Sequence, residues 1–159
     1  MYRVQYTGFY LFTMNLFSLI EYCSNYHTID DGWRKIRDWM SSVEANSDKD
    51  NLEMDGNNWF RFIEPAGTKL PDTSPPKKSF EGEQICDTYA VAWMEGSHPN
   101  TTNAIVQRNV CFSWFRKKCM GGPLSIHVGK CNGNDGNDFY IYQLKQPSSK
   151  SGISAYCAL

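Results

Sequence analysis

The sequence predicts a small, disulfide-stabilised α+β domain, mainly antiparallel strands with one or two short helices and long loops. Short segments rich in aromatic and β-branched residues alternate with Gly-, Pro- and Asn-rich turns, which is typical of antiparallel strands. One segment near the N-terminus instead has apolar residues at helical spacing. Six widely spaced cysteines could close the long loops as disulfides, which would stabilise such a fold.

The composition fits a single domain and excludes a nucleic-acid partner. The 159 residues include five Trp, nine Tyr and nine Phe, enough for an aromatic core. The formal net charge is −1. The longest basic run, Arg116–Lys118, is too short to follow a phosphate backbone.

Residues 1–20 have the features of a signal peptide or of another N-terminal extension. Arg3 precedes an uncharged run from Gly8 to Ile20, which matches a signal peptide in length and is too short to span a bilayer. No Ala-x-Ala-like site precedes Glu21, so a buried strand or helix, or a wrongly assigned gene start, is the alternative. We predict no membrane span.

A short helix is predicted within residues 28–40. Asp30 or Asp31 could cap its first turn, where acidic side chains also suit the helix dipole. The apolar residues at helical spacing would face the core; they are Trp33, Ile36, Trp39 and Met40. The polar segment that follows, residues 41–58, reads as a loop.

Four strands are predicted after this loop. In residues 58–65, Phe60 and Phe62 fall on one face, and Pro65 ends the strand because it donates no ladder hydrogen bond. A long irregular connection covers residues 66–83. The remaining strands are predicted at residues 103–112, 124–130 and 138–145, the second with the alternation of a half-buried strand.

The cysteines indicate an extracellular chain. No CxxC pair is present, which argues against a thioredoxin-like site and the common zinc frameworks. An even number at wide spacing fits three disulfides, for which 15 connectivities are possible. The alternative is a cytosolic protein with reduced thiols. The six are Cys23, Cys86, Cys111, Cys119, Cys131 and Cys157.

An N-glycosylation acceptor, Asn100-Thr101-Thr102, follows the pair His98-Pro99. A glycan there requires an exposed loop in a secreted protein. We therefore take Asn100 as the candidate glycosylation site.

Two other kinds of site built on histidine have weak support. A zinc site could draw on His27, His98 and His127, yet none of them forms an HxH or HExxH pair. A cysteine nucleophile could pair with His98, but no orienting group or oxyanion hole is identifiable, and a bonded cysteine has no thiolate. We expect neither a metal nor a catalytic residue.

Calcium is a further alternative. The segment CNGNDGND, residues 131–138, offers several oxygen ligands. It lacks the final Glu and the flanking helices of an EF-hand, and Asn, Asp and Gly are also the residues of turns.

Six blocks of sequence follow one another over residues 23–157: "CSNYHTIDDGWR", "NWFRFIEPAGTKLP", "CDTYAVAWMEGSHP", "AIVQRNVCF", "CNGNDGNDFYIYQL" and "SAYC". Taken in this order, they resemble the uromodulin-like cysteine-rich extracellular domain. This eight-to-ten-cysteine domain occurs in uromodulin, in the pancreatic secretory granule major glycoprotein and in a liver-specific protein with a zona pellucida module. The resemblance implies one secreted, non-enzymatic domain over residues 23–157.

Four cysteines of the family pattern are absent from this chain. One would precede the strand around Trp59, one would follow Pro71, one stands where this chain has Met120, and one would lie near Gly152. In the family, the cysteines near Trp59 and Gly152 are partners, so their joint loss leaves no orphan. The resemblance then implies Cys23–Cys131 and Cys86–Cys157, with Cys111–Cys119 as the remaining pair.

The resemblance also implies what the domain does. The family's own glycan acceptor stands at the position of Glu95, whereas the acceptor here lies at Asn100. Glycans of this region in the vertebrate relatives act as decoys for mannose-binding bacterial adhesins. We therefore expect an extracellular glycoprotein or recognition domain without a cofactor, whose partner is an extracellular or glycan-binding protein. A calcium-dependent adhesion module is the alternative, and a Cys/His enzyme or metal protein a less favoured one.

Overall fold

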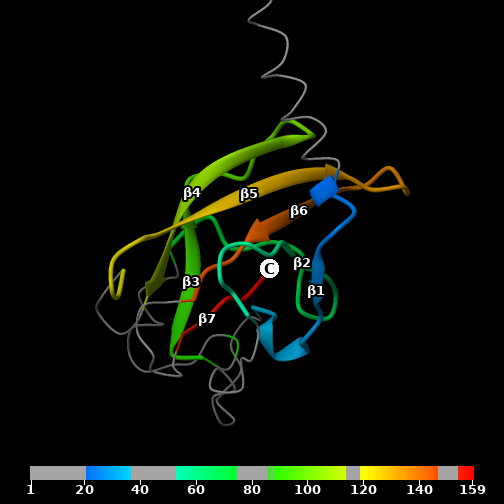
Figure 1. Cartoon of the computed structure of the whole chain (residues 1–159). Coiled ribbons are helices and arrows are strands. Elements are labelled where there is room, and N and C mark those ends of the chain that lie inside the picture. Colours follow the sequence, from blue (N-terminus) through cyan, green and yellow to red (C-terminus); the bar gives the residue numbers. More distant parts are fainter. Residues whose placement is uncertain (1–20, 37–52, 75–85, 87, 114–118, 147–153) are drawn as a thin grey trace, which may run out of the picture.

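A computed structural model describes residues 21–36, 53–74, 86, 88–113, 119–146 and 154–159. Its seven strands form one sheet in the order β1-β2-β6-β5-β4-β3-β7. The sheet curls, and the C-terminal segment lies inside the curve (Figure 1). The strands are β1 (His27–Ile29), β2 (Phe60–Phe62), β3 (Ala90–Glu95), β4 (Ala104–Ser113), β5 (Leu124–Asn132), β6 (Asp138–Gln143) and β7 (Ser154–Ala155).

The centre of the sheet is the antiparallel meander of β3, β4, β5 and β6. β2 pairs with β6 in antiparallel orientation, and the two short edge strands add parallel pairs, β1 on β2 and β7 on β3. Short edge strands expose few unpaired backbone groups, which limits pairing with other chains.

The predicted α+β class is wrong, because the described residues are almost entirely β. They contain one 3-10 helix, η1 (Gly32–Arg34), and their only α-helical residues are Glu21 and Tyr22. Of the helix predicted at residues 28–40, Thr28 and Ile29 belong to β1, and Lys35 is extended. Residues 37–40, which include Trp39 and Met40, lie outside the described residues.

Backbone partners from the C-terminus explain why this segment is not helical. Ile36 N–H donates to the carbonyl of Ala158 at 2.7 Å, and Ala158 N–H donates to the carbonyl of Arg34 at 2.9 Å. These bonds satisfy the groups that a helix would pair internally. Asp31 makes no side-chain cap; its carboxylate instead accepts from Arg34 Nε at 3.0 Å.

The four strands predicted after residue 57 are present, with shifted ends. The strand expected at residues 58–65 is shortened to β2, whereas β5 extends two residues beyond its expected end. β3 and the edge strands β1 and β7 were not predicted. The alternation expected for β5 is confirmed at Ile126 and Val128, which are buried, and at His127, which is exposed.

The main core fills the concave face of the sheet. Side chains alternate between the two faces of a strand, so every second residue of the meander faces this core. Burying these side chains is the main favourable contribution to folding. The core includes Phe60, Phe62, Met94, Val110, Phe112, Ile126, Val128, Tyr142, Leu144 and Tyr156.

Three disulfides are present, and they are the pairs that the resemblance implies: Cys23–Cys131, Cys86–Cys157 and Cys111–Cys119. All three lie on the outer face of the sheet. Cys131 packs with Trp59 and Ile141, and Cys157 packs with Val91 and Ala155, in two small clusters separate from the main core. Cys111 stands between two core residues of β4 and so points outward. Residues of the N-terminal segment cover part of this face, because Tyr22 and Tyr26 pack on the first cluster and Trp33 and Ile36 on the second.

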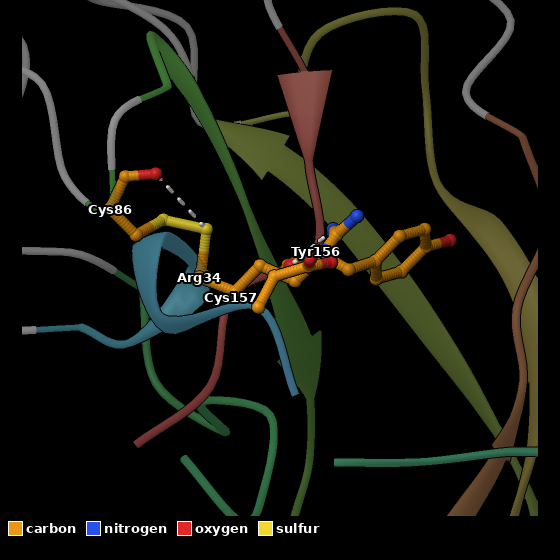
Figure 2. Close-up of a disulfide and its surroundings, with 5 residues drawn as sticks. Arg34, Cys86, Tyr156 and Cys157 are labelled. Atoms are coloured by element: carbon orange, nitrogen blue, oxygen red, sulfur yellow. Dashed lines mark hydrogen bonds and ion pairs between the residues drawn. A yellow bond between two sulfur atoms is a disulfide. The ribbon is translucent and has the colours of Figure 1, made fainter. Parts of the chain in front are cut away.

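A buried arginine joins the N-terminal segment to the residues that follow β7, beside one bridge (Figure 2). Arg34 is only 1% exposed, and its Nη1 donates to the carbonyl of Tyr156 at 3.2 Å. Its guanidinium also lies 4.3 Å from the centre of the Trp33 ring. Tyr156 is adjacent to Cys157, so Arg34 and the Cys86–Cys157 bridge hold the same segment.

Candidate glycan-acceptor loop

The loop between β3 and β4 carries the predicted acceptor Asn100. Gly96 and Asn103 stand near its two ends with positive φ angles of 89° and 59°. Glycine and asparagine are residues that tolerate this left-handed conformation. Asn103 N–H donates to the carbonyl of Lys130 at 2.8 Å, and Lys130 Nζ donates to the carbonyl of Asn100 at 3.1 Å. The backbone of the loop is therefore fastened to β5.

The side chain of Asn100 points to solvent from this fastened backbone. Asn100 is exposed, and its Oδ1 accepts from Thr101 Oγ1 at 3.2 Å. Its Nδ2, the atom that would carry a glycan, makes no hydrogen bond to any residue that the structure describes. Thr102 Oγ1 lies 3.4 Å from both carboxylate oxygens of Asp138.

An ion pair reinforces the attachment of the loop. Lys130 Nζ lies 2.7 Å from Asp138 Oδ2. The hydrogen bond to Asp138 raises the pKa of Lys130 above its ordinary value, so the ammonium is charged at neutral pH. This ammonium also holds the Asn100 carbonyl, which ties the acceptor to the first residue of β6.

His98, two residues before the acceptor, is buried under the loop. Its side chain is 6% exposed and its ring centre lies 4.5 Å from that of Tyr140. Nε2 lies 2.9 Å from the Tyr142 hydroxyl, and Nδ1 lies 3.5 Å from Asp72 Oδ2. The Tyr142 hydroxyl also accepts from Leu70 N–H at 3.1 Å.

The hydrogen-bond directions determine the protonation of this network. The Tyr142 oxygen accepts from Leu70 N–H, so its single proton is available to His98 Nε2. The proton of a neutral imidazole then sits on Nδ1, facing Asp72. Burial lowers the pKa of His98, although Asp72 opposes this shift. His98 is thus a structural residue in its neutral form.

The two other histidines do not join His98. His27 is exposed and lies against the Phe60 ring, 5.6 Å between ring centres. His127 Nδ1 lies 2.8 Å from Gln143 Oε1 on the exposed face of the sheet. Within the described residues, no group of three or more His, Cys, Asp or Glu side chains could hold a metal ion.

The six cysteines are all bonded, so none offers a thiol to His98. A cysteine nucleophile needs a thiolate, which a disulfide lacks. The arrangement therefore gives the Cys/His enzyme alternative no reacting group.

The segment that offers oxygen ligands for calcium, residues 131–138, contains the turn between β5 and β6. Asp135 Oδ1 accepts from Asn137 N–H at 3.0 Å and Asp135 Oδ2 accepts from Asn137 Nδ2 at 3.1 Å. These hydrogen bonds lower the pKa of the Asp135 carboxyl. They are the local bonds of an Asx turn, which accounts for the choice of residues in this segment.

Among the residues described, no helix has the length and apolar character needed to cross a membrane. The predicted signal peptide, residues 1–20, lies outside this part of the chain. The fold and the bonded cysteines define the class: a β domain stabilised by disulfides, with an exposed Asn-x-Thr motif at Asn100.

The chain belongs to the uromodulin-like domain family, whose model matches residues 60–158. It is 30% identical over 123 residues to the pancreatic secretory granule membrane major glycoprotein GP2 of Rattus norvegicus, covering 77% of this chain and 20% of the relative. It is 31% identical over 135 residues to uromodulin of Rattus norvegicus, covering 85% of this chain and 18% of the relative. The chain therefore spans about a fifth of the length of these relatives. Domains of this family occur in secreted glycoproteins.

Two features of the site have no clear signal in the sequence. The His98–Tyr142 contact joins residues 44 positions apart, and only the adjacent Pro99 signalled that His98 sits in a turn. The burial of Arg34 was also missed, because a charged residue in a polar segment reads as exposed.

Proposed function

We propose that this chain is a non-enzymatic extracellular domain that carries an N-linked glycan at Asn100 and presents it to a carbohydrate-binding protein. The observation that carries the proposal is the exposed Asn100 side chain on a loop whose backbone is fastened to β5. Membership of the uromodulin-like family supports the extracellular setting, as do three disulfides, which persist in oxidising compartments.

A fastened loop suits the presentation of a glycan. The Lys130 ammonium holds the backbone of Asn100, and Lys130 is itself held by Asp138. Ordering the loop therefore takes place during folding and adds little further entropy cost when a partner binds. A partner that contacts both sugar and loop would meet the loop in a single arrangement.

The side chains of the site also support a non-enzymatic role. Both ring nitrogens of His98 face internal partners, Tyr142 and Asp72, and the side chain is nearly closed to solvent. A general base has to reach a proton of its substrate within hydrogen-bond distance. His98 in this position has no such access.

The glycan is tested by secreting the chain from a host that performs N-glycosylation. We expect an intact mass above that of the polypeptide, and a decrease to the polypeptide mass plus one deamidation after treatment with peptide-N-glycosidase. Thr102→Ala should abolish the glycan, because the acceptor motif requires Ser or Thr two residues after Asn. Thr101→Ala is the matched control, since it removes the neighbouring hydroxyl and keeps the motif. An unshifted mass for the wild-type chain would remove this proposal.

The partner is tested with an immobilised mannose-specific lectin, using the chain from a host that makes high-mannose glycans. We expect retention of the wild-type and Thr101→Ala chains, release by methyl α-mannoside, and no retention of Thr102→Ala. Equal retention of Thr102→Ala would show that the sugar at Asn100 is not what the lectin binds.

A further inference from the structure

The outer face of the sheet carries six polar side chains at neighbouring positions on four strands. Main-core residues occupy the other face, at Met94, Val110, Ile126 and Tyr142, so the residues next to them in sequence point outward. We call the six the polar face: Glu95, Gln107, Asn109, Ser125, His127 and Gln143.

Strand register aligns these residues in two rows. Glu95 of β3 lies opposite Asn109 of β4, which lies opposite Ser125 of β5. The second row runs from Gln107 through His127 to Gln143 of β6, on three strands that lie side by side in Figure 1. Neighbouring strands are roughly 4.8 Å apart, which is the scale of one sugar ring.

Hydrogen bonds between the polar side chains hold them in position. Asn109 Nδ2 donates to Glu95 Oε2 at 3.3 Å, and Gln107 Nε2 donates to Ser125 Oγ. His127 pairs with Gln143 at 2.8 Å. Exposed amide side chains usually lose rotamer freedom when they bind a ligand, and these bonds remove part of that cost beforehand.

The same side chains keep unused hydrogen-bonding groups. Gln107 Oε1 and Asn109 Oδ1 accept no hydrogen bond from the residues that the structure describes, and each amide has a second N–H. Each of these two amides therefore offers one free acceptor and one free donor. A ligand whose groups both donate and accept would match them.

A shallow groove lies at one end of the polar face, beside the turn after β3. It is lined by Glu95, Gly96, Gln107, Arg108 and Asn109. Gly96 forms the turn at this end with its positive φ of 89°, which a glycine adopts readily. The groove is open, so it suits a ligand that lies along the surface.

The charges of the groove restrict the ligand class. Glu95 is its single carboxylate and Arg108 its single cation. Two nitrogens of Arg108 are already used, Nε by the carbonyl of Ser97 at 2.9 Å and Nη1 by the carbonyl of Gln107 at 2.9 Å. A polyanion needs several free cations, and an apolar helix needs an apolar groove; this one provides neither.

We propose that the polar face and its groove bind a neutral oligosaccharide. Sugar hydroxyls both donate and accept, which matches the free amide groups of Gln107 and Asn109, and the sugar carries no charge to complement. Ile105, 38% exposed and two residues before Gln107 on the same face, adds a surface for the apolar side of a sugar ring. This binding is independent of a glycan on Asn100.

The test is an NMR titration of the whole oxidised chain carrying Asn100→Gln, so that its own glycan is absent. The probes are mannotriose, chitotriose and lactose, with a neutral Ser/Asn-rich peptide as a protein-like arm. We expect at least one oligosaccharide to shift the backbone amides of residues 107–109 and 125–127. Gln107→Ala/Asn109→Ala should weaken that binding about tenfold or more, because two pairs of hydrogen bonds are lost.

Asn134→Ala, in the exposed turn between β5 and β6, is the matched control and should leave the affinity unchanged. Thermal melting of each variant checks that the fold is retained. The proposal is overturned if no oligosaccharide shifts these amides, if the double variant binds as well as its parent, or if only the peptide binds there. A negative result would not bear on the proposed glycan at Asn100, because the titrated chain carries Asn100→Gln and lacks that glycan.

Discussion

The Tyr142 hydroxyl lies 2.9 Å from His98 Nε2 and, on its other side, accepts the backbone N–H of Leu70 at 3.1 Å. One phenol oxygen thus joins three separate parts of the fold: β6, the loop that carries the glycan acceptor, and the segment before Pro71. Pro71 in turn accepts from Met94 N–H of β3 at 2.8 Å. The acceptor loop is therefore coupled to the core through His98.

The first prediction concerns pH. Burial lowers the pKa of His98 below its ordinary value of 6.5, so the folded chain binds this proton less readily than the unfolded chain. The stability contributed by neutral His98 is fully present above pH 6.5 and is lost as the pH falls from there toward the lowered pKa. A charged imidazole would also have two N–H donors, leaving the Tyr142 proton without an acceptor.

Melting temperatures at about pH 7.5 and about pH 5.5, on either side of the ordinary histidine pKa, check this dependence. We expect the wild-type chain to lose more stability between these values than His98→Gln, which retains a polar side chain but cannot titrate. The carboxyls of Asp55 and Asp135 also have lowered pKa values, but both variants keep them, and they titrate at lower pH. Equal losses in the two proteins would contradict the role given to His98.

The second prediction separates two tyrosines of β6. Tyr142→Phe removes the partner of Leu70 N–H and of His98 Nε2, and should cost about 1–3 kcal/mol of unfolding free energy. Tyr140→Phe is the control: its ring also contacts His98, but its hydroxyl makes no hydrogen bond to the described residues. Urea denaturation measures both. Similar unfolding free energies for the two variants would show that the Tyr142 hydroxyl contributes no more stability than the Tyr140 hydroxyl.

The third prediction concerns the buried Arg34. Arg34→Met keeps much of the apolar stem but loses the bond to the Tyr156 carbonyl, leaving that carbonyl buried and without this charged donor. We expect a loss of about 1.5–3 kcal/mol. Asp31→Asn should cost less than about 1 kcal/mol, since the Asp31 side chain is 48% exposed. The reverse order in chemical denaturation would mean that the ion pair, and not the Tyr156 contact, stabilises this corner.

The fourth prediction ranks two disulfides. Replacing Cys86 and Cys157 with Ala opens a loop of 71 residues, whereas replacing Cys111 and Cys119 opens one of 8. Loop-closure entropy makes the first loss larger by about 2 kcal/mol. Denaturation of the two double variants tests this ranking. A greater loss for Cys111/Cys119 would show that native-state packing, not chain entropy, dominates.

The sequence was informative wherever local pattern and tertiary structure agree. Ile126 and Val128 alternate with exposed neighbours because β5 has one buried and one solvated face, and that period is visible in the residues themselves. The acceptor motif at Asn100 is likewise local. The family pattern named the same cysteine pairs that the structure contains, although cysteine spacing alone left 15 connectivities open.

The predicted helix is absent because the backbone groups that bond to this segment instead lie far away in the chain. The spacing of Trp33 and Ile36 fits a helix, yet both pack near the Cys86–Cys157 bridge, and the backbone of Ile36 pairs with Ala158. Neither the partner nor its position follows from residues 28–40. The same limit applies to His98, whose role depends on Tyr142 and Asp72.

The central claim is that this is an oxidised extracellular domain glycosylated at Asn100. The most direct measurement is the intact mass of the secreted wild-type chain, alkylated without reduction and weighed before and after peptide-N-glycosidase. We predict no alkylated cysteine and one glycan, mapped to Asn100 by peptide analysis. More than two alkylated cysteines, or a mass that the glycosidase leaves unchanged, would contradict the account.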